Sequence, residues 1–305
     1  MTPRIRARAA SLNRHRLGEG PVWDAARNRL LWVDIDAGEV LLGTLGIDGS
    51  IKTTDRLAFA GTVGAVAVAA NGDLIIAGAE ELLTRRRDGT TENGPRILPP
   101  DSDRRLNDAA ADPVGRLLVG SLSLLPAGST TETLSVVDHD GSVRVLDADL
   151  TLSNGLGWTA DGSRMYSVDT LRRRISVRDY EPMTGYAGLR SNFVELQDGY
   201  PDGLTLDAED HVWVAVWGKG EVHRYSPAGE LVAVVDVPAP HTSSVAFAGP
   251  LLDTLCITTA TQDLDESALA RFPDSGRIFT VVPGPLGVPQ PLWGGFDRPD
   301  PTIDS

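Results

Sequence analysis

Residues 154–170 read NGLGWTADGSRMYSVDT, in which two stretches that alternate apolar with polar or small residues flank the turn sequence ADGS. Successive side chains of a β-strand point to opposite faces, so this pattern predicts a β-hairpin with one buried face. Five other segments share the pattern of a first residue, an alternating stretch, a turn and a second apolar stretch. In chain order, the first residues of the six segments are Glu19, Val63, Asn107, Asn154, Asp202 and Ser243.

The six segments recur at a regular interval, because their first residues lie 41 to 48 positions apart. Further short strands follow each hairpin, and GEVHRYSPAGEL at residues 220–231 is an example. Four strands in roughly 40 to 50 residues make one propeller blade. The repeat therefore predicts an all-β fold, a six-bladed β-propeller that forms a single domain over residues 1–305 with its core at about 17–291.

The two ends of the chain are expected to meet in the last blade. The start, MTPRIRARAASLNRHR at residues 1–16, alternates in a way that favours a first strand over a ragged tail. Together with RIFTVVPG at residues 277–284, this strand would complete the sixth blade and remove an exposed sheet edge. The terminal tail, residues 295–305, is expected to be disordered or pinned loosely on the surface.

The composition restricts the possible partners. The 305 residues include 28 Lys and Arg against 42 Asp and Glu, a net charge of −14, which disfavours nucleic acid and favours cations and neutral or cationic small molecules. No run approaches 18 apolar residues and no signal-peptide pattern follows the basic start, so we expect no membrane partner and a cytoplasmic location. The single cysteine, Cys256, excludes a disulfide framework and is interpreted as a small buried hydrophobe. The oligomeric state stays open.

Carboxylate or amide side chains occupy four of the six first positions, namely Glu19, Asn107, Asn154 and Asp202. Equivalent positions in successive blades point to the same region, so these side chains should meet at one end of the central channel. Two carboxylates and an amide carbonyl are three hard oxygen ligands with a charge of −2, which suits Ca²⁺, Mg²⁺ or Mn²⁺ and could accept Zn²⁺. The alternative interpretation is that they are ordinary turn residues that precede strands.

Other kinds of site find little support. The five histidines are scattered, with no H-E-x-x-H or H-x-H motif, and no G-x-S-x-G sequence indicates a nucleophilic serine. His241 alone lies near the start of the sixth segment, beside the expected channel, and is a candidate for contact with a substrate.

Five blocks of this chain resemble the senescence-marker-protein, gluconolactonase and regucalcin-like family. The blocks are LGEGPVWD (17–24), RLND (105–108), residues 153–170, residues 201–230 and SVAFAGPLLDTLCITTA (244–260). The resemblance implies a six-bladed propeller with one divalent cation in the central channel, with Ca²⁺ as the first choice, and hydrolysis of sugar lactones or related cyclic esters. It places the metal ligands on Glu19, Asn154 and Asp202 and the substrate-binding pair on Arg105 and Asn107.

The mechanism that we expect is cation-assisted hydrolysis of a small-molecule lactone or ester, in which Asp202 takes a proton from the attacking water. This role requires one oxygen of Asp202 to stay free of the cation. Two alternatives remain. The same site could cleave another electrophile, such as an organophosphate or an aryl ester, or the propeller could be a calcium-binding regulatory module without turnover.

One stretch departs from the pattern of the family. Many lactonases of this kind carry an acidic residue after the third-blade motif, whereas GSLSLLPAGST has Leu124 and Leu125 there. The third segment also has N-D-A at residues 107–109 instead of the common N-D-G. We therefore expect the same cation site with a less polar substrate pocket.

Overall fold

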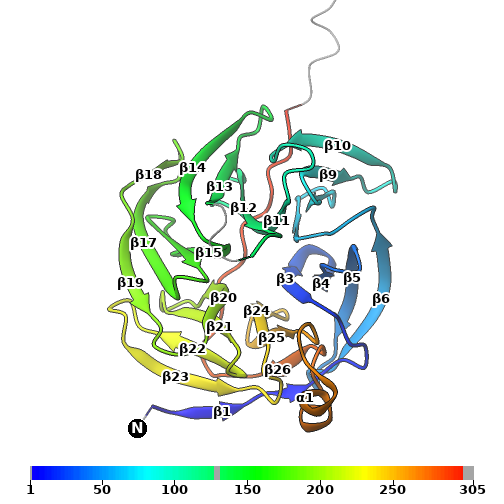
Figure 1. The fold of residues 1–305 in the computed structure, drawn as a ribbon, viewed down its shortest axis with the longest axis vertical. Helices are drawn as coiled ribbons and strands as arrows, with labels where there is room; N and C mark the ends of the chain where they lie inside the picture. Colours follow the sequence, from blue (N-terminus) through cyan, green and yellow to red (C-terminus); the bar gives the residue numbers. More distant parts are fainter. Residues whose placement is uncertain (1, 127–130, 298–305) are drawn as a thin grey trace, which may run out of the picture.

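The computed structural model describes residues 2–126 and 131–297, and within these ranges the chain forms six β-sheets around a central channel (Figure 1). The predicted six-bladed propeller is therefore confirmed. In each blade the first strand lies against the channel and the following strands pair antiparallel toward the outside.

The strands of the first three blades follow the sequence order. The first blade contains β3 (Gly18–Asp24), β4 (Arg29–Asp34), β5 (Glu39–Leu45) and β6 (Ile51–Ala58). The second contains β7 (Ala65–Val68), β8 (Leu74–Ala77), β9 (Glu81–Arg85) and β10 (Thr91–Arg96). The third contains β11 (Arg104–Ala111), β12 (Leu117–Ser123), β13 (Glu132–Val137) and β14 (Val143–Leu150).

The remaining blades carry additions to this plan. The fourth contains β15 (Ser153–Trp158), β16 (Arg164–Asp169) and β17 (Arg174–Glu181), with β18 (Tyr186–Ala187) and β19 (Ser191–Glu195) both paired to β17. The fifth contains β20 (Tyr200–Leu206), β21 (Val212–Trp217), β22 (Glu221–Tyr225) and β23 (Leu231–Asp236). The sixth contains β24 (Thr242–Ala248), β25 (Thr254–Thr259) and β26 (Phe279–Val281). Two short helices, η1 (Ala25–Arg27) and α1 (Glu266–Arg271), complete the described elements.

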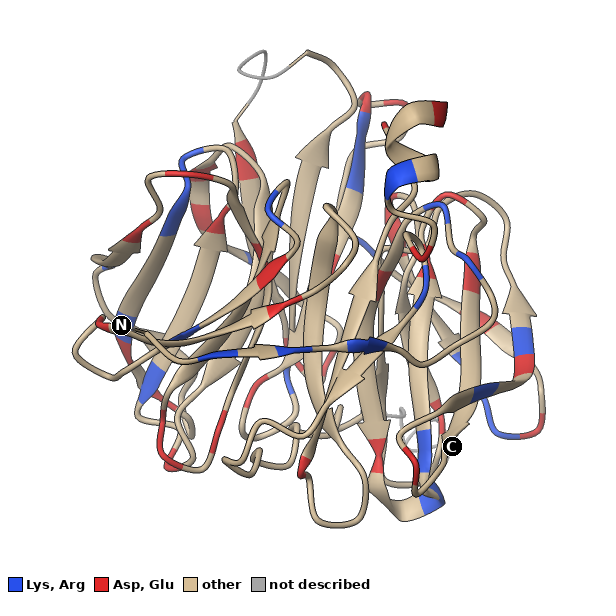
Figure 2. Cartoon of the chain, turned by 90° about the horizontal axis from the view of Figure 1, so that it is seen from below, with Lys and Arg blue, Asp and Glu red and all other residues tan. Residues whose placement is uncertain are grey.

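The N-terminal segment closes the ring, as expected. Strand β2 (Arg8–Ala9) pairs antiparallel with β26 and becomes the outer strand of the sixth blade. Strand β1 (Arg4–Arg6) instead joins the outer edge of the fifth blade, parallel to β23. Figure 2 shows this basic strand crossing the rim of the molecule, where Arg4 forms ion pairs with Glu221 and Asp236. The segment thus covers two sheet edges.

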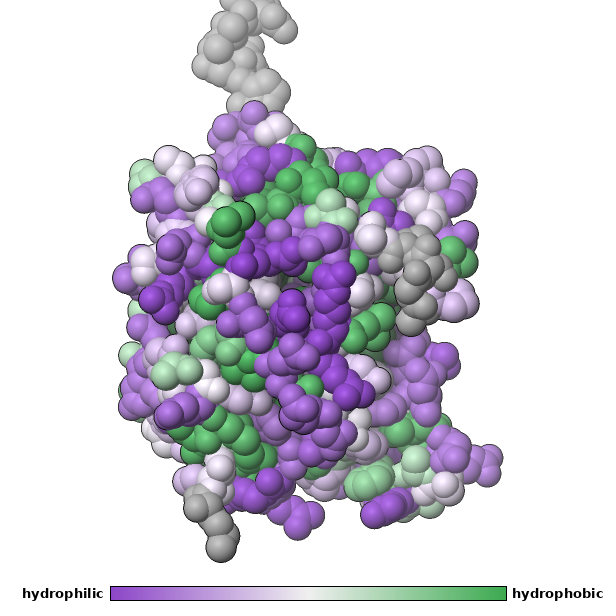
Figure 3. Space-filling model, turned by 60° about the vertical axis from the view of Figure 1, so that its left-hand side comes forward, coloured by the Kyte–Doolittle hydropathy of each residue, from purple (hydrophilic) through white to green (hydrophobic). Residues whose placement is uncertain are grey.

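Apolar side chains fill the spaces between neighbouring blades. Trp213 of the fifth blade and Phe247 of the sixth meet edge to face with ring centroids 5.8 Å apart. Cys256 is completely buried in the apolar cluster that contains Trp32, and burial raises the pKa of its thiol to about 12, which confirms its interpretation as a small hydrophobe. On the flank seen in Figure 3, polar residues cover most of the surface and hydrophobic residues form small groups.

Residues 286–297, which we call the C-terminal strap, run across the channel at the end away from the starts of the inner strands (Figure 1). Backbone hydrogen bonds tie the strap to four blades, the second, third, fifth and sixth. Their partners outside the strap are Val68, Gly115, His139, Ala208 and Leu252. At the start of the terminal tail, the N–H of Asp297 donates to the carbonyl of His139 at 2.7 Å, in keeping with the alternative of a tail pinned on the surface. Residues 298–305 lie outside the described residues.

Among the residues that the structure describes, no helix has the length and apolar character needed to span a membrane.

Candidate functional site

Irregular pairing aims the site side chains into the channel. The ladder between the first two strands shifts register directly after Glu19 and Asn154. In the other two blades the shift surrounds the site residue, with Asn107 between Leu106 and Ala109 and Asp202 between Pro201 and Leu204. A bulge of this kind turns one side chain out of the alternation of the sheet. Four inner strands therefore present a polar residue to the channel at the same level.

Glycines after two site residues let the inner strands approach one another. A Cβ on Gly155 would lie 2.5 Å from the carbonyl oxygen of Asp202, and a Cβ on Gly203 would lie 2.0 Å from Oγ of Ser244. Both distances are impossible for a larger residue, so the N-G and D-G pairs follow from the crowding around the channel.

All five predicted site residues line one cavity of about 500 Å³ at this end of the channel: Glu19, Arg105, Asn107, Asn154 and Asp202. The other two first positions have structural surroundings. Val63 is buried in the apolar core, and the hydroxyl of Ser243 donates to the carbonyl of Gly18, which joins the sixth blade to the first. The roles of the five residues remain predictions.

A chain of hydrogen bonds fixes the amides of the site. Nη1 of Arg105 donates to Oδ1 of Asn107 at 2.8 Å, and Nδ2 of Asn107 donates to Oδ1 of Asn154 at 3.2 Å. Nδ2 of Asn154 then donates to the hydroxyl of Thr170, which donates to the carbonyl of Pro201. The amide hydrogens of Asn107 are both used, because Nδ2 also donates to the carbonyl of Ser153. Asn107 can therefore meet a substrate only through Oδ1.

Three buried carboxyl groups, those of Glu19, Asp108 and Asp202, lie close enough to influence one another electrostatically. Burial, the charge of Glu19 and the charge of Asp108 hold the pKa of Asp202 well above its ordinary value. Burial and the charge of Asp108 raise the pKa of Glu19 to about 8, against the favourable effect of Arg105. Burial raises the pKa of Asp108 itself to about 6. This concentration of buried negative charge is costly unless a cation neutralises it.

Arg105 is the only Lys, Arg or His among the described residues that line the cavity. Burial lowers its pKa to about 10, while the charges of Asp36, Glu19 and Asp202 favour the protonated form. The side chain is 8% exposed, and Nη1 also donates to the carbonyl of Leu106 at 3.0 Å. Its guanidinium thus stays charged near neutral pH and is held beside the carboxylates.

The donor set fits a divalent cation. Within the described residues, Oδ1 of Asp202 is buried and has no hydrogen-bond partner. Asn154 donates through Nδ2, so its Oδ1 is the atom turned toward the neighbouring polar side chains. With Glu19, these residues provide hard oxygen donors of the type that Ca²⁺ and Mg²⁺ prefer. Without a bound cation, ionisation of these buried carboxyl groups would be energetically costly.

A second group of potential ligands lies elsewhere, after the far end of β20. Ligand atoms of Asp207, Glu209 and His211 all lie within 4.8 Å of one another. Oδ2 of Asp207 already accepts from the indole of Trp213 and from Nε of Arg224, both at 2.8 Å. These bonds give Asp207 a structural role in the turn.

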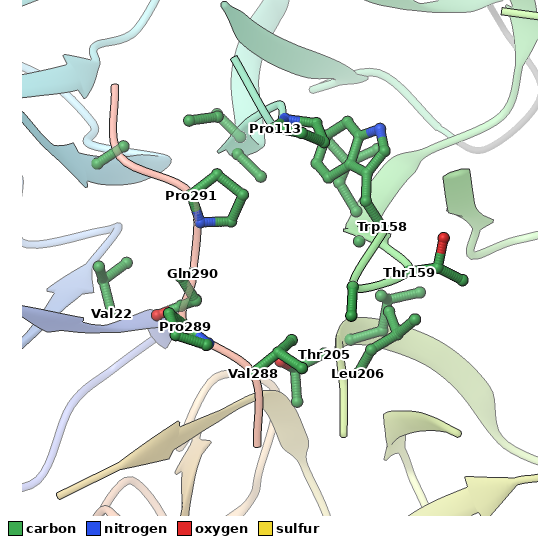
Figure 4. Close-up of a pocket in the computed structure, with 18 of the residues that line it drawn as sticks. Val22, Pro113, Trp158, Thr159, Thr205, Leu206, Val288, Pro289, Gln290 and Pro291 are labelled. Atoms are coloured by element: carbon green, nitrogen blue, oxygen red, sulfur yellow. The ribbon is translucent and has the colours of Figure 1, made fainter. Parts of the chain in front are cut away.

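A second cavity, of about 420 Å³, lies at the strap end of the channel (Figure 4). Its lining includes Val22, Trp158, Leu206 and residues 288–291 of the C-terminal strap, and none of the described lining residues is charged. This cavity lacks the groups needed for acid–base or metal chemistry.

Three residues near the site were missed by the sequence analysis. Asp108 adds a third carboxyl group, Thr170 positions Asn154, and Trp217 lines the cavity. His241, the predicted candidate for substrate contact, stacks against Trp217 with ring centroids 4.1 Å apart and is not among the lining residues. The repeat could have indicated Asp108, which directly follows a first position, whereas Trp217 depends on packing between blades.

The raised carboxyl pKa values predict a pH dependence for the metal-free protein. Glu19 keeps its proton to about pH 8 when folded but loses it near 4.5 when unfolded. Stability from this group is therefore complete below pH 4.5 and is lost as the pH rises to about 8. We expect Ca²⁺ at about 100 times its Kd at pH 8 to raise the Tm at that pH by on the order of 5 °C. The same Ca²⁺ concentration should raise the Tm much less at pH 5, where protons compete with the cation for the carboxylates. Thermal denaturation with EDTA or Ca²⁺ measures this, and an equal shift at both pH values would contradict it.

Comparisons with known proteins identify relatives along most of the chain. The family model described as SMP-30/Gluconolactonase/LRE-like region matches residues 17–261. Pentonolactonase XacC of Haloferax volcanii is 36% identical over 255 residues, which cover 83% of this chain and 84% of that protein. Regucalcin of Xenopus laevis is 30% identical over 88% of this chain and 91% of its own length. A crystal structure of the calcium-binding protein regucalcin from Agrobacterium tumefaciens has a TM-score of 0.88 at 28% identity and covers 95% of this chain and 98% of its own.

Proposed function

Because this chain belongs to the SMP-30/gluconolactonase/LRE-like family, we propose that it is a divalent-cation-dependent lactonase that opens sugar lactones. The relatives named as lactonases support hydrolysis of sugar lactones in general. The observation that carries the proposal is the buried, unpartnered Oδ1 of Asp202, among the described residues, in one cavity with Glu19, Asn154 and Arg105. Ca²⁺ is the first choice of cation, since two relatives are regucalcins and one is titled calcium-binding.

Glu19, Asn154 and Asp202 would hold the cation, and Arg105 would bind the substrate. When bound, a divalent cation supplies Lewis acidity toward the lactone carbonyl and toward water. Arg105 is placed to donate to the carbonyl oxygen and to stabilise the negative charge that develops there. Asn107 holds the guanidinium in position through its Oδ1.

Asp202 is the proposed general base. As the water oxygen bonds to the carbonyl carbon, the oxygen of Asp202 that does not hold the cation takes a proton from the water, and collapse of the tetrahedral intermediate breaks the bond to the ring oxygen. The ring oxygen then receives this proton from Asp202, which returns to its ionised form, and the product is a hydroxy acid. Asp202 can perform this step because a cation needs only one of its two carboxylate oxygens.

The direct test is a pH-indicator assay of sugar lactones with protein stripped by EDTA and then supplied with Ca²⁺, Mg²⁺, Mn²⁺ or Zn²⁺. We expect acid release that needs both protein and cation. If no lactone is hydrolysed under any cation while calorimetry detects cation binding, the protein is a cation-binding module and the proposed lactonase function is wrong.

We expect Glu19→Gln to weaken cation binding by on the order of 10- to 100-fold, since the change removes one of two ligand charges and keeps the shape. The metal-free variant should be at least as stable as the wild type, because it lacks a buried carboxyl group with a raised pKa. Titration calorimetry measures the affinity. Glu209→Gln is the matched control, since it alters the other potential ligand group. A loss of affinity in Glu209→Gln instead of Glu19→Gln would move the cation to that group.

A further inference from the structure

Four leucines of the third and fourth blades form an apolar wall of the site cavity, beside the polar residues that these blades present to the channel. Leu122 and Leu124 come from the end of β12 and the loop after it, and Leu152 and Leu171 flank the hairpin of β15 and β16. Leu124 is 62% exposed and Leu171 is 40% exposed, so both are available to a bound molecule. A wall of this kind offers no hydrogen bonds to a polyol chain.

Apolar side chains also line the opposite side of the cavity. Leu17 and Ile35 come from the first blade, which stands across the ring from the fourth. Trp217 extends this surface, and its indole lies 12° from parallel with the ring of His241. Nδ1 of His241 lies 2.9 Å from the carbonyl oxygen of Gln262, so the imidazole is held against the indole. A bound molecule would therefore meet apolar surface on two sides.

Most polar lining groups are already paired. Asp36 forms an ion pair with Arg16 at 2.6 Å, and the hydroxyl of Ser123 accepts the N–H of Leu125. In the part of the chain that the structure describes, the hydroxyl of Thr62 is buried without a partner. Arg105, Asp202 and Thr62 offer polar groups in or beside the channel, and Tyr200 and Gln262 add a phenol and an amide to the lining. The leucine side chains offer none.

We propose that the site selects deoxy sugar lactones, in which the exocyclic end is a methyl group instead of a hydroxymethyl group. This inference rests on the proposed lactonase function. The ring oxygens would face Arg105 and Thr62, and the methyl group would lie against the leucine wall. A hydroxyl placed there would lose its water without gaining a partner.

Two matched pairs of substrates test the proposal: 6-deoxy-L-mannono-1,4-lactone against L-mannono-1,4-lactone, and 6-deoxy-L-galactono-1,4-lactone against L-galactono-1,4-lactone. Each pair differs only in the terminal group, so the ratio of kcat/KM isolates its effect. We expect a ratio of about 10 or more in favour of the deoxy member in at least one pair, the range known for one small group in an apolar pocket.

Variants at two adjacent leucines assign the effect to the wall. Leu124→Asn should lower the ratio of kcat/KM at least about threefold. The asparagine removes apolar contact with the methyl group of the deoxy substrate and provides a hydrogen-bond partner for the terminal hydroxyl of the other substrate. Leu125→Asn is the matched control, since Leu125 is exposed and is not among the lining residues, and its ratio should stay unchanged. Equal or higher kcat/KM for the hydroxylated member of both pairs, or equal effects of the two variants, would overturn the selectivity and leave the lactonase function intact. Absence of hydrolysis of any lactone would overturn the proposed function itself.

Discussion

Asp202→Asn is expected to lower kcat by roughly 10²- to 10⁴-fold, the usual cost of losing a general base. An asparagine keeps an oxygen that can coordinate a cation, so the variant should still bind Ca²⁺, although less tightly. The amide cannot take the proton from water. The substitution also removes a buried carboxyl group whose pKa is raised by burial and by the charge of Glu19. The metal-free variant should therefore be at least as stable as the metal-free wild type.

Glu19→Gln separates the two roles of a carboxylate in this site. At saturating Ca²⁺, this variant should recover most of the wild-type kcat, because the substitution lowers only the affinity for Ca²⁺. Asp202→Asn should stay inactive at any Ca²⁺ concentration. Steady-state assays over a Ca²⁺ series, with binding measured by calorimetry, make the comparison. Near-normal turnover in Ca²⁺-loaded Asp202→Asn would exclude Asp202 as the base.

Arg105→Ala should lower kcat/KM for a lactone by about 10²- to 10³-fold, the loss typical of one donor to a developing oxyanion. The guanidinium is the only cationic side chain of the described cavity lining, so no neighbour can replace it. Cation affinity should hold or rise, because a positive charge that favours the ionised forms of Glu19 and Asp202 but repels the cation is gone. Kinetics and calorimetry on the same preparations measure both effects.

Two further variants complete the Arg105 experiment. Arg105→Lys keeps the positive charge but not the planar guanidinium with its paired donors. Its kcat/KM should therefore lie between those of Arg105→Ala and the wild type. Arg56→Ala is the control, since Arg56 is exposed on the outer strand β6, away from the cavity, and forms an ion pair with Glu39. If Arg105→Ala strongly weakens cation binding but leaves KM and kcat at saturating cation unchanged, Arg105 supports the metal site and does not act on the substrate.

The sequence repeat was sufficient to predict the architecture. Each unit supplies its own hairpin and turns, so local patterns carry most of the information needed for a blade. Closure by the N-terminal strand was also predictable, since the sixth unit lacks a full set of strands of its own. The position of β1 on the fifth blade was not, because a short basic strand can pair with any free edge, and only Glu221 and Asp236 specify this one.

The candidate site was predictable where it follows the repeat. Glu19, Asn107, Asn154 and Asp202 occupy equivalent places, and a ring of blades brings equivalent places together. Trp217 lies at the end of the second strand of its blade, and its neighbour His241 belongs to the next blade. Contacts of this kind depend on how two blades pack, which no periodic pattern encodes.

The strap across the far end of the channel has a consequence for the traffic of molecules through the proposed enzyme. With the strap at the far end, lactone and product would share the entrance on the site side, so a product that lingers would act as a competitive inhibitor. The proposed ring opening would convert a neutral ester into an anion, and the chain has a net charge of −14. It would therefore change a molecule that this acidic protein admits into one that it repels, and the chemical step itself would promote the emptying of the site.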